Sequence, residues 1–343
     1  DRSRADRLRH RPFEMMNSPP RQRTHRRRIH RCTVLAGFFA LVFAAGSHAE
    51  RLVVLSDLNG PYGSTDYNPR IEAAVARILE LRPDAVLVTG DMVAGQSWPT
   101  LSRDRLTAMW DAFHERISTP LRAAGIPLAV APGNHDASAS RGFELDRAVY
   151  ADEWRDRISE LGPLESGGPP FFYAVAVGRV LVIALDATLP GELPAEQRRF
   201  LDEVLQRHGP RFRFRVVVAH LPLWPFAQGR ESEILRDPEL EELLSSRRVD
   251  LFLSGHHHAF WAGVSTAGVV HVSVGSLAGA VRPLVGTRDR QPHGMTLINL
   301  KPSGEVEITA LVEPDFRSVL PWSKLPQSVV RGEKELTRFD RVH

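Results

Sequence analysis

The sequence predicts an α/β protein in which a parallel sheet is covered by helices and a second sheet packs on the first. Short apolar, β-branched runs alternate with segments of helical periodicity over most of the chain, and this alternation is typical of parallel strands joined by helices. From residue 249 onward the runs read mainly as strands, which indicates the second sheet. The chain has 343 residues, of which 43% are hydrophobic. A chain of this length and composition can bury a full core without disulfides.

The expected elements follow in order from these local patterns. Strands are expected at 52–55, 85–88, 127–130, 171–177, 179–185, 215–218, 249–253, 269–274, 295–300 and 305–312. Helices are expected at 71–83, 102–118, 146–160, 194–208 and 238–246. Asn68 and Pro69 give the first helix a cap and a first residue, and Gly178 divides two strands as in a hairpin.

The N-terminal segment has the order of a secretory signal peptide. An Arg-rich stretch at 21–31 is followed by an uncharged apolar run at 32–45 and by a small-x-small site at 47–49. The apolar run is shorter than the roughly 20 residues of a membrane span, so we expect cleavage before Glu50 and export to the periplasm or the medium. An uncleaved segment would instead anchor the chain in a membrane. The choice between general and twin-arginine export stays open.

The positive charge of the chain lies almost entirely in this segment. The formal net charge is +3, yet residues 1–49 contain 11 Arg and three acidic residues, so the remainder is acidic. An acidic remainder without a stripe of Lys and Arg argues against a nucleic-acid partner. The single Cys, Cys32, lies in the same segment, so the rest of the chain has neither disulfides nor thiolate ligands.

Three parts are expected along the chain. Residues 1–49 form the basic segment and signal peptide, and residues 50–314 form one α/β domain. Residues 315–343 are expected to be a C-terminal extension, because their mixed charge and prolines suit a segment that wraps the domain or is partly disordered. After cleavage of the signal peptide we expect no stable membrane span.

Five apolar runs end in residue types that bind metals. These residues are Asp57 and Asn59, then Asp91, then Asn134 with His135 and Asp136, then His220, and finally His256 with His258. Open α/β sheets bind ligands beyond the carboxyl ends of their strands, so we expect these side chains to converge in one crevice at the rim of a sheet. Residues two apart in an extended chain share a face, which would point His256 and His258 into the crevice and turn His257 aside as a bystander or substrate-facing residue. Taken singly, each residue is as well explained as an ordinary turn residue.

The candidate ligands favour two ions over one. Oxygen and imidazole ligands together suit Mn, Fe or Zn and differ from the all-oxygen sites of Ca²⁺ or Mg²⁺. Seven candidates are too many for one tetrahedral ion, whereas two ions about 3.5–4 Å apart with one shared carboxylate would use them. The excess positive charge of such a pair would hold a phosphate and lower the pKa of a bridging water.

These motifs, in this order, resemble the blocks of the calcineurin-like metallophosphoesterase superfamily. The blocks are Asp57-Leu58-Asn59, Gly90-Asp91, Gly133-Asn134-His135-Asp136, His220 after an apolar strand, and Gly255-His256-His257-His258. The resemblance spans roughly residues 52–260. It implies a four-layer α-β-β-α sandwich of two packed mixed sheets for the domain at 50–314, and a hydrolase that acts on phosphoric ester bonds.

The resemblance also implies a role for each residue. The residues implied to bind the first metal are Asp57, Asp91 and His258, and Asn59 stands where the family has a further ligand of this ion. Those implied to bind the second metal are Asp91, which would bridge the two ions, Asn134, His220 and His256. A metal-bridging hydroxide would attack the phosphorus, while His135, oriented by Asp136, would protonate the leaving oxygen.

Two positions depart from the family pattern. The family usually has His at the position of Asn59, whose amide oxygen is a weaker ligand, so the first metal is expected to be looser or of another kind. Alternatively, Asn59 is a simple turn cap, and Tyr62, Asp66 or Tyr67 in the following loop could compensate. Ala94 stands where the purple acid phosphatase branch usually has a Tyr ligand, which disfavours that branch.

We therefore expect an exported hydrolase of phosphate mono- or diesters, acting on a small-molecule or cell-envelope substrate. The rival is a non-catalytic binding or scaffold protein on the same fold, in which Asn59 has weakened the first metal site. A nuclease is a third possibility, against which the acidic charge argues. The sequence names neither the ester nor the oligomeric state.

Overall fold

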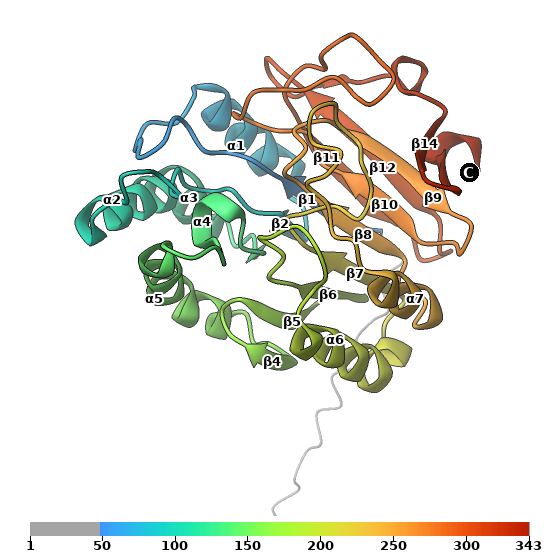
Figure 1. Cartoon of the computed structure of the whole chain (residues 1–343), viewed down its shortest axis with the longest axis horizontal. Coiled ribbons are helices and arrows are strands. Elements are labelled where there is room, and N and C mark those ends of the chain that lie inside the picture. Colours follow the sequence, from blue (N-terminus) through green and yellow to red (C-terminus); the bar gives the residue numbers. More distant parts are fainter. Residues whose placement is uncertain (1–48, 343) are drawn as a thin grey trace, which may run out of the picture. The chain divides into compact units, whose positions relative to one another are not determined.

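The computed structural model describes residues 49–342, and Figure 1 shows how their helices and strands are arranged. The expected signal peptide lies outside these residues, apart from Ala49 just before the expected cleavage site. No helix within residues 49–342 is long and apolar enough to span a membrane.

The first sheet has six strands in the order β13-β12-β11-β1-β2-β3. Their bounds are Glu50–Leu55 (β1), Ala85–Val88 (β2), Leu128–Val130 (β3), Gly294–Leu300 (β11), Val306–Val312 (β12) and Ser318–Val319 (β13). β1, β2 and β3 run parallel, whereas β11 pairs antiparallel with β1, so the sheet is mixed. β2 is buried along its whole length, as is expected of a strand that is covered on both faces.

The second sheet has nine strands in the order β14-β15-β9-β10-β8-β7-β6-β5-β4. The first five strands of this sheet along the chain are Glu165–Gly168 (β4), Phe172–Val177 (β5), Val180–Ala184 (β6), Phe214–Val218 (β7) and Leu251–Ser254 (β8). The remaining bounds are Trp261–Ser265 (β9), Val270–Ser273 (β10), Ser328–Arg331 (β14) and Lys334–Arg338 (β15). The four strands β6, β7, β8 and β10 run parallel and the outer strands antiparallel.

The helices lie beside the two sheets. Their bounds are Arg70–Leu81 (α1), Arg103–Phe113 (α2), Thr119–Ala123 (α3), Asn134–Ala137 (α4), Glu144–Glu160 (α5), Ala195–Arg207 (α6) and Pro238–Ser246 (α7). In Figure 1, α1 to α3 lie toward β1 and β2, whereas α6 and α7 lie beside β5 to β8. Helix α1 buries Ile71, Ala74 and Ile78, whose spacing is that of one helical face. The predicted class, two mixed sheets with helices outside them, is confirmed.

Several elements differ from the sequence-based expectation. The helix expected at 102–118 is interrupted by a π-helical turn at His114–Ser118 and continues to Ala123 as α3. Strands β4 and β9 were not expected, because the sequence ESGG of β4 is polar and β9 follows the histidine cluster after only two residues. The C-terminal extension supplies β13 to the first sheet, and its β15 pairs with β9 at the edge of the second.

The strand ends that carry the candidate ligands come from both sheets. β1, β2 and β3 belong to the six-stranded sheet, whereas β7 and β8 belong to the nine-stranded sheet. The expectation of a crevice at the rim of one sheet is therefore wrong. The segment after β10 of the nine-stranded sheet contacts the end of β1 in the six-stranded sheet. The amides of Leu277 and Gly279 donate to the carbonyls of Ser56 and Asp57.

Candidate metal centre

Four of the candidate ligands have a left-handed backbone. The φ angles of Asp57, Asp91, His256 and His258 are 53°, 57°, 64° and 54°. This conformation is uncommon for residues other than Gly and tends to occur at functional sites, where it turns the chain sharply. The extended, alternating geometry expected for residues 256–258 is therefore wrong. The expectation that His256 and His258 face one pocket agrees with the structure. His256 and His258 both line the same pocket, whereas His257 is fully buried and bonds to neighbouring backbone.

Close approach of backbones lets these turns meet. A Cβ added to Gly133 would overlap the amide nitrogen and carboxylate of Asp91, and one added to Gly255 would overlap the Ser56 hydroxyl. Only Gly fits at these two positions, because the strand ends are in contact there. The Gly residues of the sequence motifs therefore bring the ligand-bearing turns together.

The imidazole of His220 is the centre of the first group of ligands. Its Nδ1 lies 2.8 Å from the carbonyl of Thr89, which can only accept a hydrogen bond, so Nδ1 carries the proton. The Nε2 atom then faces three further electron-pair donors. It lies 2.8 Å from Asn134 Oδ1, 3.2 Å from His256 Nδ1 and 3.4 Å from Asp91 Oδ2. Such a convergence of lone pairs in a buried place needs a cation to hold it together.

A second group of ligands joins Asp57 and His258. His258 Nε2 lies 3.0 Å from Asp57 Oδ1, yet this buried oxygen has no hydrogen-bond partner of acceptable geometry. His258 Nδ1 lies 3.0 Å from the carbonyl of Ala280, which assigns the proton to Nδ1 and the lone pair to Nε2. A lone pair beside an unpartnered carboxylate oxygen is the arrangement of two ligands of one metal ion.

Electrostatic interactions within the cluster show the same demand for positive charge. Burial alone would lower the pKa of His220, but the carboxylate of Asp91, aided by Asp57, raises it to about 9. Although burial opposes the change, His220 in turn holds the pKa of Asp91 far below its usual range. His258 likewise lowers the pKa of Asp57 against the effect of burial. Both carboxylates therefore stay charged, and a bound metal ion would displace the proton that His220 otherwise attracts.

The structure brings six of the seven predicted metal ligands into these two groups. Asp91, His220 and His256 have ligand atoms within 4.8 Å of one another. Asn59 lines the same pocket, and its backbone amide donates to the carbonyl of Asp91 over 3.2 Å. Of the three residues expected to compensate for Asn59, Tyr62 lines the pocket and Asp66 does not, whereas the Tyr67 hydroxyl donates to the Met92 carbonyl.

His135 lies at the edge of the cluster and is held by backbone. Its Nδ1 lies 3.0 Å from the carbonyl of Gly95 and its Nε2 lies 3.9 Å from Asp91 Oδ2. Tyr62 packs on the imidazole with ring centroids 5.2 Å apart. Nδ1 donates its hydrogen bond to the Gly95 carbonyl, so Nε2 is the nitrogen available to a bound molecule.

The predicted partnership of Asp136 with His135 is not the one that the structure shows. The buried Asp136 carboxylate accepts hydrogen bonds from the amides of Met92, Val93 and Gly133, at 2.7, 3.0 and 2.9 Å. It therefore ties the turn after β2 to the turn after β3. Burial, aided by the charge of Asp91, raises the pKa of Asp136 to about 7.

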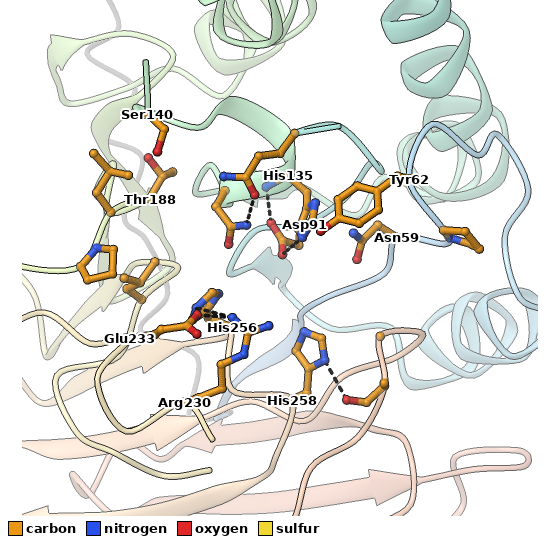
Figure 2. A pocket seen from close by; sticks show the side chains of 18 of the residues that line it. Asn59, Tyr62, Asp91, His135, Ser140, Thr188, Arg230, Glu233, His256 and His258 are labelled. Atoms are coloured by element: carbon orange, nitrogen blue, oxygen red, sulfur yellow. Dashed lines mark hydrogen bonds and ion pairs between the residues drawn. The ribbon is translucent and has the colours of Figure 1, made fainter. Parts of the chain in front are cut away.

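The pocket also contains residues that the sequence did not suggest. It has a volume of about 510 Å³, and Gln96 contributes to its walls. Arg230 and Glu233 line it as well (Figure 2). Gln96 Oε1 accepts from Asn134 Nδ2 over 2.6 Å, which turns the amide oxygen of Asn134 toward His220. These three residues lie in loops without a periodic pattern, so no sequence signal marks them.

The donor set fits a pair of borderline metal ions. Two carboxylates, one or two amides and three imidazoles make up the two groups; Asp57 and His220 are fully buried, and the other members line the pocket. These are the ligand types that suit Mn, Fe and Zn. Asp91 contacts His220 of the first group and interacts electrostatically with Asp57 and His258 of the second.

Comparisons with known proteins identify the family of the chain and structures that share its fold. A family model described as calcineurin-like phosphoesterase matches residues 50–260. Purple acid phosphatase 15 of Arabidopsis thaliana is 24% identical over 243 residues, which cover 64% of this chain and 42% of that protein. A purple acid phosphatase from yellow lupin (Lupinus luteus) seeds superposes with a TM-score of 0.57 at 17% identity, covering 78% of this chain and 52% of the other. A dimetal phosphatase from Danio rerio gives a TM-score of 0.55 at 15% identity, with 80% and 98% covered.

The curated relatives bear on one expectation. The three at 24–25% identity are named as purple acid phosphatases, so the chain is similar to members of the branch that Ala94 was expected to disfavour. Ala94 itself is buried and offers no ligand atom, so the likeness does not extend to that position. The chain spans less than half the length of these relatives, and the solved structures show a shared fold alone.

Proposed function

The chain belongs to the calcineurin-like phosphoesterase family, and from this premise we propose that it hydrolyses phosphate mono- or diesters at a dinuclear metal centre. The observation that supports this most is the convergence at His220 Nε2. Three electron-pair donors from three other loops lie within 3.4 Å of this atom, and no proton arrangement satisfies all of them. A metal ion would satisfy all four at once.

The ligands divide between two positions. Asn134, His220 and His256 would hold one ion, and Asp57 and His258 the other, with Asp91 between them and Asn59 as a further oxygen ligand of the second group. Two bound ions would supply charge for the phosphoryl oxygens and an acidified water as nucleophile. The left-handed turns and their Gly contacts keep these side chains in place before substrate arrives.

His135 has the position of a general acid for the leaving group. Its Nδ1–H donates to the Gly95 carbonyl, so the second proton of the imidazolium form would lie on Nε2 and point into the pocket beside Asp91. Tyr62, with 66% of its surface exposed, lies against His135 and would contact the leaving group. Arg230 lines the same pocket, where it is paired with Glu233.

The size and charge of the chain favour a small ester as the substrate. A pocket of about 510 Å³ accommodates a molecule of the size of a nucleotide or a phospholipid headgroup, and an envelope phosphate is equally compatible.

Export remains part of the proposal, supported by the Arg-rich and apolar order of residues 21–49. Recovery of a processed chain that starts at Glu50 from the periplasm or the medium would support it, and an intact N-terminus in the cytoplasm would contradict it.

Turnover with defined metals tests the proposal. The full chain is stripped with a chelator, reloaded with Mn²⁺, Zn²⁺ or Fe²⁺, and assayed on an aryl phosphate monoester and an aryl phosphodiester. Hydrolysis that returns with metal and is abolished in Asp91→Asn supports the enzyme. Metal-free or inert protein in every reloading supports the scaffold alternative, for which the Asn59 position is the motivating observation.

A further inference from the structure

The second nitrogen of His256 is bound by a carboxylate that has no part in the predicted ligand set. Nδ1 of His256 faces His220 Nε2 at 3.2 Å, whereas Nε2 lies 2.7 Å from Glu233 Oε2 (Figure 2). A carboxylate oxygen at this distance accepts the hydrogen bond of an imidazole N–H. The proton of the imidazole is therefore on Nε2, and the lone pair is on Nδ1, where a metal ligand needs it.

The carboxylate of Glu233 is itself fixed by its neighbours. It forms an ion pair with Arg230 three residues earlier, and the Glu233 amide donates to the Arg230 carbonyl over 2.9 Å. The same loop, residues 226–235, is tied to other parts of the fold at both ends. The Gln228 amide donates to the Pro283 carbonyl and the Leu235 amide donates to the Pro222 carbonyl, over 3.0 and 2.8 Å.

The imidazole of His257 forms hydrogen bonds with the backbone of this loop. Its Nδ1 accepts from the amides of Phe226 and Ala227, at 3.1 and 3.4 Å, and its Nε2 donates to the carbonyl of Glu233 over 3.1 Å. One neutral tautomer satisfies all of these contacts, and the ring is fully buried. His257 thus fixes the 226–235 loop, and Glu233 of this loop binds the imidazole of His256.

We propose that Glu233 is a positioning residue that sets the tautomer and the orientation of His256 for the metal ion bound with His220 and Asn134. This inference rests on the proposed dinuclear function, and it assigns to the 226–235 loop a role in metal affinity. A carboxylate behind a metal-bound imidazole raises the basicity of the ligand and restrains its ring, and the loss of such a partner typically weakens metal binding by about 10- to 100-fold.

Metal titration of matched variants tests the proposal. The metal-stripped full chain is titrated with Mn²⁺ or Zn²⁺ by calorimetry, as wild type and as Glu233→Ala, Glu233→Gln and Glu231→Ala. Glu231 lies in the same loop, is exposed and is absent from the pocket walls, so its variant is the control. We expect Glu233→Ala to weaken one of the two binding events by about 10- to 100-fold and to leave the other unchanged.

The Gln variant separates positioning from a general effect on folding. Its amide oxygen can still accept the Nε2 proton of His256, so we expect it to recover most of the affinity that the Ala variant loses. Wild-type affinity for both ions in Glu233→Ala, or equal weakening of both, overturns the inference while leaving the proposed function intact. Wild-type protein that binds fewer than two ions overturns both, and thermal unfolding of each variant shows whether a loss of binding reflects a loss of fold.

Discussion

Asn59 is the residue at which this chain departs most from the pattern of its family. It lines the pocket of the candidate metal centre and its backbone is bonded to Asp91, but an amide oxygen is a neutral and weaker ligand than imidazole. The other group of ligands contains two imidazoles and has supporting contacts from Thr89, Gln96 and Glu233. The two ions should therefore differ in affinity, with the looser one beside Asn59.

Replacement of Asn59 by His is expected to tighten the weaker ion. An imidazole in place of the amide should raise its affinity for Zn²⁺ or Mn²⁺ by at least about tenfold, which is about 1.4 kcal/mol. Metal titration of the Asn59→His variant measures the change, with Asn68→His as an exposed control outside the pocket. Unchanged affinity would show that Asn59 is a turn residue and no ligand.

Replacement of His135 by Ala is expected to lower kcat without removing metal. Loss of a general acid typically costs about 10²- to 10⁴-fold in rate. Assays on an aryl and an alkyl phosphate, together with metal analysis, check the assignment. The alkyl ester should lose more activity, because its alkoxide is the poorer leaving group and depends more on protonation. A His135→Ala protein that has lost its metal would show that this residue is a ligand instead.

The sequence identified most of the residues of the site but gave the wrong local geometry for some of them. His256 and His258 were expected to point together because of strand alternation, whereas their left-handed backbones produce the same outcome by a sharp turn. The ligand types and their order could be predicted, since each follows an apolar strand. Glu233 and Gln96 could not, because tertiary contacts alone bring their loops to the pocket.

The elements that carry the site are the turns after five parallel strands, and Asp136 joins two of them. Its carboxylate accepts from three buried amides in the turns after β2 and β3. The parallel strands were predictable because each is a short apolar, β-branched run between segments of helical periodicity. The outer strands β4, β9, β14 and β15 of the second sheet were not, because their short, mixed sequences form strands only by pairing with a neighbour.

Replacement of Asp136 by Ala is expected to destabilise the fold. Each buried amide left without a partner costs about 1–3 kcal/mol, so the variant should lose several kcal/mol of unfolding free energy. Chemical denaturation compares it with Asp111→Ala, which changes an exposed carboxylate on α2. A stable Asp136→Ala protein with a reduced kcat would instead support the original expectation that Asp136 orients His135.

At the scale of the whole molecule, the site is a contact between two sheets. β1 to β3 supply Asp57, Asp91 and Asn134, whereas β7 and β8 supply His220 and His256. The sequence predicted both sheets, but which strands belong to which sheet depends on pairing that no local pattern records. Metal binding should therefore couple the two sheets and raise the stability of the fold.

The stability of the fold should also depend on pH through a buried histidine away from the site. Burial, aided by the charge of Arg331, lowers the pKa of His271 on β10 to about 3. The unfolded chain binds this proton near pH 6.5, so unfolding free energy falls as the pH drops below that value, by up to about 1.4 kcal/mol per pH unit. Urea denaturation at pH 7 and pH 5 should show a smaller fall in His271→Phe, and an equal fall would contradict the assignment.

Anomalous diffraction from crystals of the metal-loaded chain tests the central claim most directly. We expect two peaks about 3.5–4 Å apart, on either side of the Asp91 carboxylate. One peak should lie within bonding distance of His220, His256 and Asn134, and the other within bonding distance of Asp57 and His258. The absence of metal density between these residues, or a single ion that leaves Asp57 and His258 unbound, would contradict the dinuclear centre.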